Sequence, residues 1–151
     1  SILYSSVMAC VLASMSAVRT SVVAFDTQIM DLTPLCADPV DLLFGFQMGG
    51  GTDIAKSVAY CQELVESPAK TLFFLISDLD EGGNRAALLR RLEELKASGV
   101  TVVVLLAIAD GGKPYYDAQT AQRVAAMDIP CFACAPEKLP ELLERALTGQ
   151  L

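Results

Sequence analysis

The sequence predicts an α/β fold, a doubly wound and mostly parallel β-sheet of the Rossmann-like kind with helices on both faces. Strand-like and helix-like patterns alternate along the chain, which implies right-handed βαβ crossovers. Apolar residues make up 53% of the sequence and charged residues 19%, which excludes disorder and fits a sheet buried on both faces. The length of 151 residues fits one domain, so we expect residues 1–151 to fold as a single unit.

The first part of the chain begins with a helix pattern and continues with strands. Apolar residues recur at helical spacing from 2 to 18, and the first basic residue is Arg19, so this run predicts a buried helix and not a signal peptide. The expected elements that follow are a strand at 20–25, a shorter strand at 28–32 that can form a hairpin with it, a short helix at 40–46, and an amphipathic helix from Asp53 to a point before Pro68.

The second part of the chain alternates strands and helices throughout. The apolar run 71–77 predicts a buried strand, and the almost wholly apolar run 100–109 predicts a central parallel strand. Between them, Asn84 is expected to cap a helix that begins at Arg85 and continues to about Ser98, where Gly99 ends it. The apolar stripe of this helix is expected at Leu88, Leu92 and Leu95, with Arg90 and Glu94 as an exposed i,i+4 pair. The remaining predicted elements are a helix at 118–127, a strand at 129–133 and a terminal helix at 137–147.

Charge and composition narrow the classes of function. The net charge of −7 and the lack of a basic run argue against a surface for nucleic acid or anionic membrane. The absence of histidine removes the usual general base and the commonest zinc ligand, which argues against an enzyme. Five irregularly spaced cysteines are typical of core thiols in a reducing compartment, so we expect a cytoplasmic protein. Cys131 and Cys134 have CxxC spacing, but their predicted strand position counts against a redox or metal role.

A glycine-rich loop is the first half of the candidate site. Gly50 and Gly51 allow the backbone to approach a neighbour closely just before the helix that starts near Asp53. Thr52 stands where an N-cap hydroxyl is expected, and Asp53 faces the positive end of the helix dipole. Thr52 therefore has two possible roles, as a helix cap or as a ligand.

An acidic turn is the second half of the candidate site. The strand at 71–77 stops at Asp78, which Asp80 and Glu81 follow closely. Loops at the carboxyl ends of parallel strands meet at one edge of the sheet, so the two loops together predict an oxygen-rich site. Asp80 and Glu81 fit a solvated turn as well as contacts with a basic partner.

These motifs resemble a known family. Gly-Gly-Gly-Thr-Asp at the start of a helix, followed by a strand that ends in Leu-Ile-Ser-Asp, resembles a von Willebrand factor type A (VWA) domain over nearly the whole chain. The resemblance is strongest to bacterial VWA domains associated with MoxR-type AAA+ ATPases. It implies a metal-ion-dependent adhesion site (MIDAS) with Thr52 and Asp78 as metal ligands. The partner-binding rim that it implies comprises Gly50, Gly51, Asp53, Asp80 and Glu81.

The sequence also departs from this family. The family's first metal motif, Asp-x-Ser-x-Ser, follows a strand that precedes the opening helix, and this sequence contains neither. We therefore expect a domain truncated at its N-terminus, in which a partner, a swapped segment or a further piece of chain fills the gap in the sheet. Two ligands are too few for tight binding of Mg²⁺ or Mn²⁺, so metal should be weakly bound or absent in this chain.

The resemblance implies a non-enzymatic, metal-ion-dependent protein–protein interaction domain, an adaptor for an AAA+ ATPase. The alternative is a nucleotide-binding or phosphotransfer α/β enzyme domain. The glycine run lacks both the lysine of a P-loop and the third glycine of a dinucleotide fold. Lys113-Pro114 resembles the lysine-proline pair of receiver domains, with Asp78 as the phosphoacceptor, but the order of elements does not match.

Overall fold

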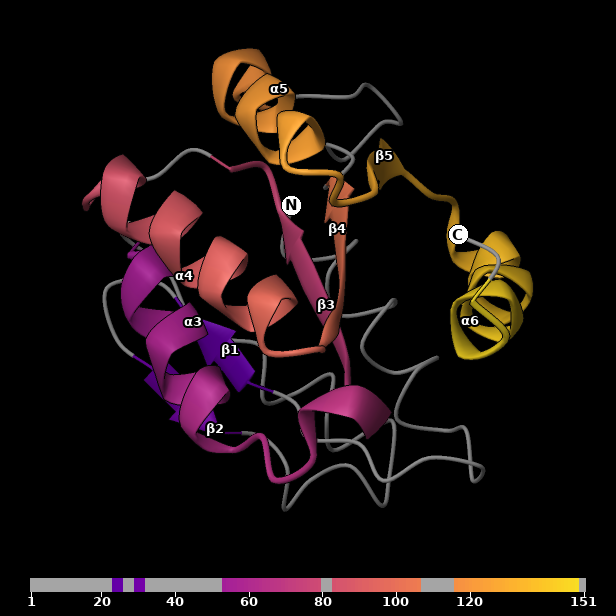
Figure 1. The fold of residues 1–151 in the computed structure, drawn as a ribbon. Helices are drawn as coiled ribbons and strands as arrows, with labels where there is room; N and C mark the ends of the chain where they lie inside the picture. The colour runs from indigo at the N-terminus through magenta and orange to yellow at the C-terminus, as the bar shows by residue number, and fades with distance from the viewer. Residues whose placement is uncertain (1–22, 26–28, 32–52, 80–82, 107–115, 150–151) are drawn as a thin grey trace.

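The described strands form two sheets (Figure 1). The computed structural model describes residues 23–25, 29–31, 53–79, 83–106 and 116–149. Within these ranges, β1 (Val23–Phe25) pairs antiparallel with β2 (Ile29–Asp31), and β3 (Leu72–Ser77), β4 (Thr101–Leu106) and β5 (Cys131–Ala133) form a parallel sheet in the order β3-β4-β5. The predicted hairpin and parallel sheet are confirmed. The helices expected at 2–18 and 40–46 lie outside the described residues.

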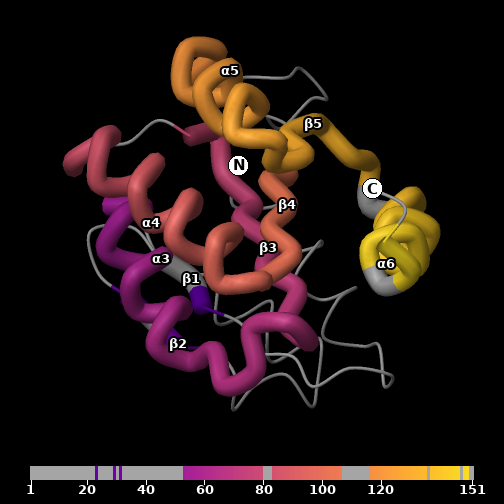
Figure 2. The backbone as a smooth tube through the Cα atoms, in the orientation of Figure 1, coloured from indigo at the N-terminus to yellow at the C-terminus, as the bar shows by residue number. Residues whose placement is uncertain are grey.

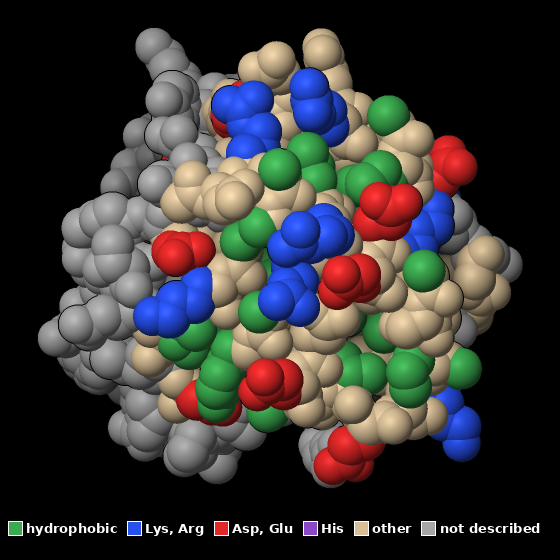
Figure 3. Space-filling view, turned by 60° about the vertical axis from the view of Figure 1, so that its left-hand side comes forward, with side chains coloured by type: hydrophobic (Ala, Val, Ile, Leu, Met, Phe, Trp, Pro, Cys, Tyr) green, Lys and Arg blue, Asp and Glu red, His purple; other side chains and the backbone are tan. Residues whose placement is uncertain are grey.

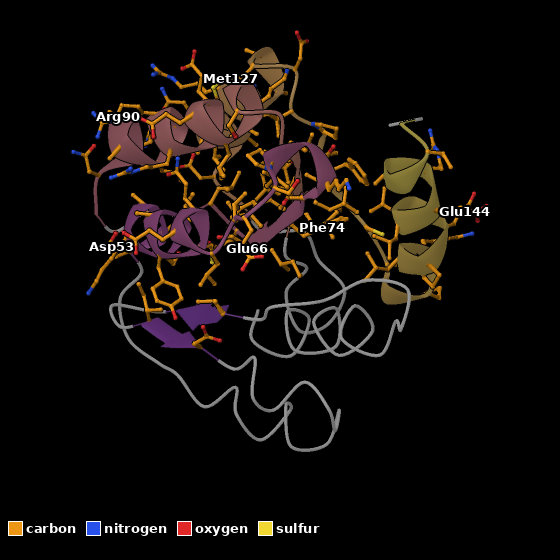
Figure 4. All side chains as sticks on the ribbon, turned by 60° about the horizontal axis from the view of Figure 1, so that its bottom comes forward. Asp53, Glu66, Phe74, Arg90, Met127 and Glu144 are labelled. Carbon is orange, nitrogen blue, oxygen red and sulfur yellow. The ribbon has the colours of Figure 1, made fainter. Side chains whose placement is uncertain are left out.

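The helices of the described ranges cover the parallel sheet (Figure 2). The α-helices are α3 (Ile54–Glu63), α4 (Arg85–Ala97), α5 (Ala118–Ala126) and α6 (Leu139–Leu147), and two short 3-10 helices, η2 (Pro68–Lys70) and η3 (Pro136–Lys138), precede β3 and α6. α3 lies between α4 and the β1–β2 hairpin, with Asp53 at its start (Figure 4). The alternation of strands and helices matches the prediction.

Two apolar clusters lie on opposite faces of the parallel sheet. The larger cluster packs Val102 and Val104 of β4 against α3, α4 and α5. The smaller cluster packs Val103 and Leu105 against α6. Because successive side chains of a strand point to opposite faces, the unbroken apolar run of β4 buries both faces at once. The prediction of helices on both faces is therefore confirmed.

α4 forms as its local sequence dictates. The side chain of Asn84 accepts a hydrogen bond of 3.0 Å from the backbone N–H of Ala87, which caps the helix. Gly99, at φ +107°, lies just beyond the end of the helix, in a backbone conformation that favours glycine. The predicted apolar stripe is buried, and its members are Leu88, Leu92 and Leu95. In the predicted exposed pair, Nε of Arg90 lies 3.9 Å from Oε1 of Glu94.

The hairpin is attached to α3 by a polar contact. The hydroxyl of Tyr60 donates a hydrogen bond of 2.7 Å to Oδ2 of Asp31, the last residue of β2. This hydrogen bond is the main reason that the pKa of Tyr60 lies above its ordinary value. The contact fixes the hairpin beside α3, where the β1–α3 packing also holds it.

The ends of the last two elements differ from the prediction. The terminal helix expected from 137 starts at Leu139, because the chain first makes the 3-10 turn η3 and then places Pro140 in the first turn of α6, where its missing N–H is harmless. The strand expected from 129 starts at Cys131. Pro130 contributes only its carbonyl to the sheet, which accepts from the N–H of Val104 at 2.8 Å.

The described surface carries charges of both signs. On the face drawn in Figure 3, basic and acidic side chains are interspersed among apolar ones, and neither sign forms a continuous patch. Among the helices of the described ranges, none combines the length and the apolar character that crossing a bilayer requires.

Candidate functional site

Asp53 is the N-cap of α3. Its Oδ1 accepts a hydrogen bond of 3.0 Å from the backbone N–H of Lys56, and the helix begins at Ile54. The expectation that Thr52 occupies the cap position is therefore wrong by one residue, because the longer carboxylate of Asp53 reaches the third N–H of the helix. Thr52 itself lies outside the described residues.

Asp78 follows β3 directly, as predicted, and a tight turn fixes its backbone. The Oγ of Ser77 accepts a hydrogen bond of 3.0 Å from the backbone N–H of Leu79, across Asp78. Leu79 has φ +61°, a left-handed conformation that is unfavourable for a residue with a Cβ. Its side chain is fully buried in the larger cluster, which stabilises this conformation. Asp78 is partly buried between these two anchored residues.

Asp117 holds Asp78 from the side of α5. The backbone N–H of Asp117 donates a hydrogen bond of 2.8 Å to the carbonyl of Asp78. The side chain of Asp117 caps α5 by accepting from the N–H groups of Gln119 and Thr120 at 3.1 and 3.2 Å. Its other oxygen lies 3.5 Å from a guanidinium nitrogen of Arg85. The hydrogen bond from the Thr120 N–H is the largest cause of a lowered pKa at Asp117, and the charge of Arg85 adds to it.

The starts of the helices gather at the edge where β3 ends (Figure 1). α3 and α4 both run away from this edge, so Asp53 and Asn84 lie at the same end of the fold as Asp78. The hydrogen bond between Asp117 and Asp78 brings the start of α5 to the same edge. Three helix N-termini thus lie toward the edge where β3 ends, and the positive ends of their dipoles favour negatively charged groups there.

The match to known families agrees with this geometry. The family described as "VWA domain containing CoxE-like protein" matches residues 1–143. The chain belongs to the VWA family. The resemblance to the VWA family that was predicted from the sequence is thereby confirmed, and membership supports a protein-interaction domain.

One curated relative and two solved structures resemble this VWA domain. The uncharacterized protein YehP of Escherichia coli (strain K12) is 40% identical over 147 residues, which is 97% of this chain but only 39% of YehP. An aerotolerance-related membrane protein from Bacteroides fragilis NCTC 9343, crystallised with multiple mutations to serines, has a TM-score of 0.70 at 9% identity, covering 98% of this chain and 88% of that one. The conserved hypothetical protein BatB from Bacteroides thetaiotaomicron has a TM-score of 0.66 at 9% identity, covering 98% and 86%. The two structures establish the fold.

The donor chemistry of the VWA domain's described site fits a hydrated hard cation. Asp78 offers a carboxylate at the strand end, and Mg²⁺ binds proteins through one or two carboxylates while it keeps several waters. The part of the chain that the structure describes contains no group of three histidine, cysteine, aspartate or glutamate side chains that could hold a metal by themselves. Besides Thr52, four predicted rim residues lie outside the described ranges: Gly50, Gly51, Asp80 and Glu81.

The cysteines with CxxC spacing point to different faces of the sheet. Cys131 packs against the larger cluster, and Cys134 is buried in the smaller one. Burial raises the pKa of the Cys131 thiol to about 11 and also raises the pKa of Cys134. Cys131 is half-buried and Cys134 is buried, and thiols with a raised pKa are poorer nucleophiles and metal ligands than thiolates.

Asp117 is the described site residue that the sequence did not predict. A residue with a good capping side chain directly before the helix expected at 118–127 was a usable signal for an N-cap. Nothing local connected it to Asp78, because the hydrogen bond joins segments on either side of α4 and β4.

Proposed function

We propose that this VWA domain is a non-enzymatic module that binds a protein partner at the carboxyl edge of β3, with a divalent cation as part of the interface. The observation that carries the proposal is the position of Asp78. Asp78 directly follows a parallel strand. Its backbone is anchored by the hydrogen bond from the N–H of Leu79 to Oγ of Ser77, and by the hydrogen bond from the N–H of Asp117 to the carbonyl of Asp78. A carboxylate in a fixed backbone is preorganised for a ligand.

Thr52 and Asp78 are the proposed ligands of Mg²⁺ or Mn²⁺. A bound cation of this kind supplies an open coordination position that a partner's carboxylate can fill. The capping of α3 by Asp53 supports the ligand role for Thr52, because the helix has its cap without the threonine hydroxyl. The proposed rim around the cation comprises Gly50, Gly51, Asp53, Asp80 and Glu81.

We expect weak metal binding by this chain, and the described sheet is consistent with this expectation. Within the described ranges, β3 pairs with β4 on one side only, and the β1–β2 hairpin forms a separate sheet against α3. We propose that a further strand sits between β1 and β3 and brings the missing ligands with it. The chain spans 39% of the length of YehP.

The proposed partner is a MoxR-type AAA+ ATPase in the cytoplasm, to which this domain presents targets. Membership in the VWA family supports interaction with proteins in general. The negative net charge of −7 favours a basic or metal-bridged partner surface.

Calorimetric titration with Mg²⁺ and Mn²⁺ tests the proposal. The samples are this chain, a version extended upstream through the next strand, and the extended version with Thr52→Ala and Asp78→Asn. Glu93→Gln, which neutralises an exposed carboxylate on the surface of α4, is the matched control. We expect binding by the extended chain and by the Glu93 control, weak binding by the short chain, and none in the double variant. An extended chain that binds neither ion contradicts the metal part of the proposal.

A further inference from the structure

Asp117 joins three elements at the proposed site. Through its backbone N–H it bonds the carbonyl of Asp78 at the end of β3, and through its carboxylate it caps α5. The same carboxylate lies 3.5 Å from Arg85, in the first turn of α4.

Arg85 reinforces this junction. Its second guanidinium nitrogen donates a hydrogen bond of 2.9 Å to Oε1 of Gln119 in the first turn of α5. The planar guanidinium therefore bridges α4 to two groups of α5 at once, a geometry that suits arginine better than lysine. Since the backbone of Asp117 is bonded to Asp78, a shift between α4 and α5 must also move the carbonyl of Asp78.

The far side of Asp78 is already fixed. Leu79 is fully buried at φ +61°, and its N–H is bonded to Ser77. The backbone of Asp78 is therefore held on one side by the turn at Leu79 and on the other side by the hydrogen bond from the N–H of Asp117. The Asp117 side is where the position of the carboxylate can be tuned.

We infer that Asp117 and Arg85 are positioning residues for Asp78: the pair locks the starts of α4 and α5 together and so aims the strand-end carboxylate at its ligand. The inference rests on the proposed function, in which Asp78 contacts the cation. Outer contacts of this kind typically change metal affinity by about ten- to a hundredfold when they are removed. Neither residue needs to touch the cation or the partner.

The competing explanation is that Asp117 only caps α5. The chain offers a matched control, because Asn84 caps α4 at the same edge through a similar hydrogen bond of 3.0 Å from the N–H of Ala87, whereas the N–H that bonds the carbonyl of Asp78 belongs to Asp117. Asn84→Ala and Asp117→Ala each remove one helix cap and should lower stability by a similar amount. Asp117→Asn keeps a capping side chain but loses the ion pair with Arg85.

The test measures Mn²⁺ affinity in the upstream-extended chain and its variants by calorimetry. We expect Asp117→Ala to weaken binding about tenfold or more, Arg85→Gln and Asp117→Asn to weaken it by an intermediate factor, and Asn84→Ala to stay within about twofold of the parent. Equal losses in Asn84→Ala and Asp117→Ala overturn the inference, because they would reflect only the loss of stability. Unchanged affinity in Asp117→Ala overturns it as well.

A second readout separates this inference from the metal proposal. The ¹³Cγ resonance of Asp78, recorded without metal, reports the environment of its carboxylate directly. If the parent binds no Mn²⁺, the metal proposal fails, and the inference is then judged on this resonance. A clear shift in Asp117→Ala and Arg85→Gln but not in Asn84→Ala supports positioning. Identical spectra in all four proteins refute it.

Discussion

Ser77→Ala tests whether the turn after β3 fixes Asp78. The substitution removes the Oγ that accepts the N–H of Leu79 at 3.0 Å and leaves the backbone and most of the side-chain volume unchanged. Ser77 is 7% exposed and Leu79 is 0% exposed, so water has little access to the N–H that loses its acceptor. A buried donor left without a partner costs about 1 to 3 kcal/mol. We therefore expect Ser77→Ala to lower the free energy of unfolding by that amount.

Urea denaturation followed by circular dichroism measures this change. For an ordinary domain with a stability of about 5 to 15 kcal/mol, the expected loss shifts the midpoint clearly and leaves the slope unchanged. Ser98→Ala is the control, because its Oγ bonds the carbonyl of Leu95 at an exposed position beyond α4, where the expected change is within about 0.5 kcal/mol. A loss in Ser77→Ala no larger than in Ser98→Ala would refute the argument that this bond holds the turn.

Three further predictions concern the buried thiols, the alternative chemistry and the partner surface. Burial raises the pKa of Cys61 and of Cys131 in the folded protein from 9.0 to about 11, so the stability that comes from burying the neutral thiols is present below pH 9 and is lost as the pH rises toward 11. The free energy of unfolding in urea should therefore fall between pH 9 and pH 11, and it should fall less in a Cys61→Ala, Cys131→Ala variant. Acetyl phosphate with Mg²⁺ should leave the intact mass unchanged, whereas a gain of one phosphoryl group that Asp78→Asn abolishes would favour the phosphotransfer alternative. Tyr116 is 38% exposed and precedes Asp117 at the proposed edge, so Tyr116→Ala should weaken binding of the AAA+ ATPase about fivefold or more, as loss of an important interface residue does. Leu64, which is similarly exposed at the end of α3, is the control, and Leu64→Ala should leave binding unchanged. Equal effects of the two substitutions would contradict the placement of the interface.

Local signals predicted α4 almost completely. The cap at Asn84, the leucine stripe and the terminating Gly99 act within a few residues of one another, so one sequence is enough to recognise them. The same holds for β4, whose unbroken apolar run can only be buried on both faces. These elements, together with β3, place Asp78 at the edge where it was expected.

The errors arose where two neighbouring residues suit the same role. Thr52 and Asp53 are both good N-caps, and only the folded helix decides that Asp53 makes the bond to Lys56. The start of α6 was predicted too early for a similar reason, because Glu137 and Lys138 fit a 3-10 turn as well as an α-helix.

The support for Asp78 could not be predicted because it is not local. The bond between Asp117 and Asp78, and the bridge from Arg85 to Gln119, join residues that the parallel sheet brings together from different crossovers. The left-handed backbone of Leu79 was also hidden, since a leucine gives no sign of positive φ in a sequence. The positions of Thr52, Gly50, Gly51, Asp80 and Glu81 stay predictions.

The most direct test of the central claim is the affinity of the upstream-extended domain for a purified MoxR-type AAA+ ATPase, measured with Mg²⁺ and with EDTA. We expect binding in Mg²⁺ that EDTA abolishes, that Asp78→Asn abolishes as well, and that Glu93→Gln leaves unchanged. Binding that survives both EDTA and Asp78→Asn would contradict a metal-assisted site at the end of β3, and no binding under any condition would contradict the proposed partner.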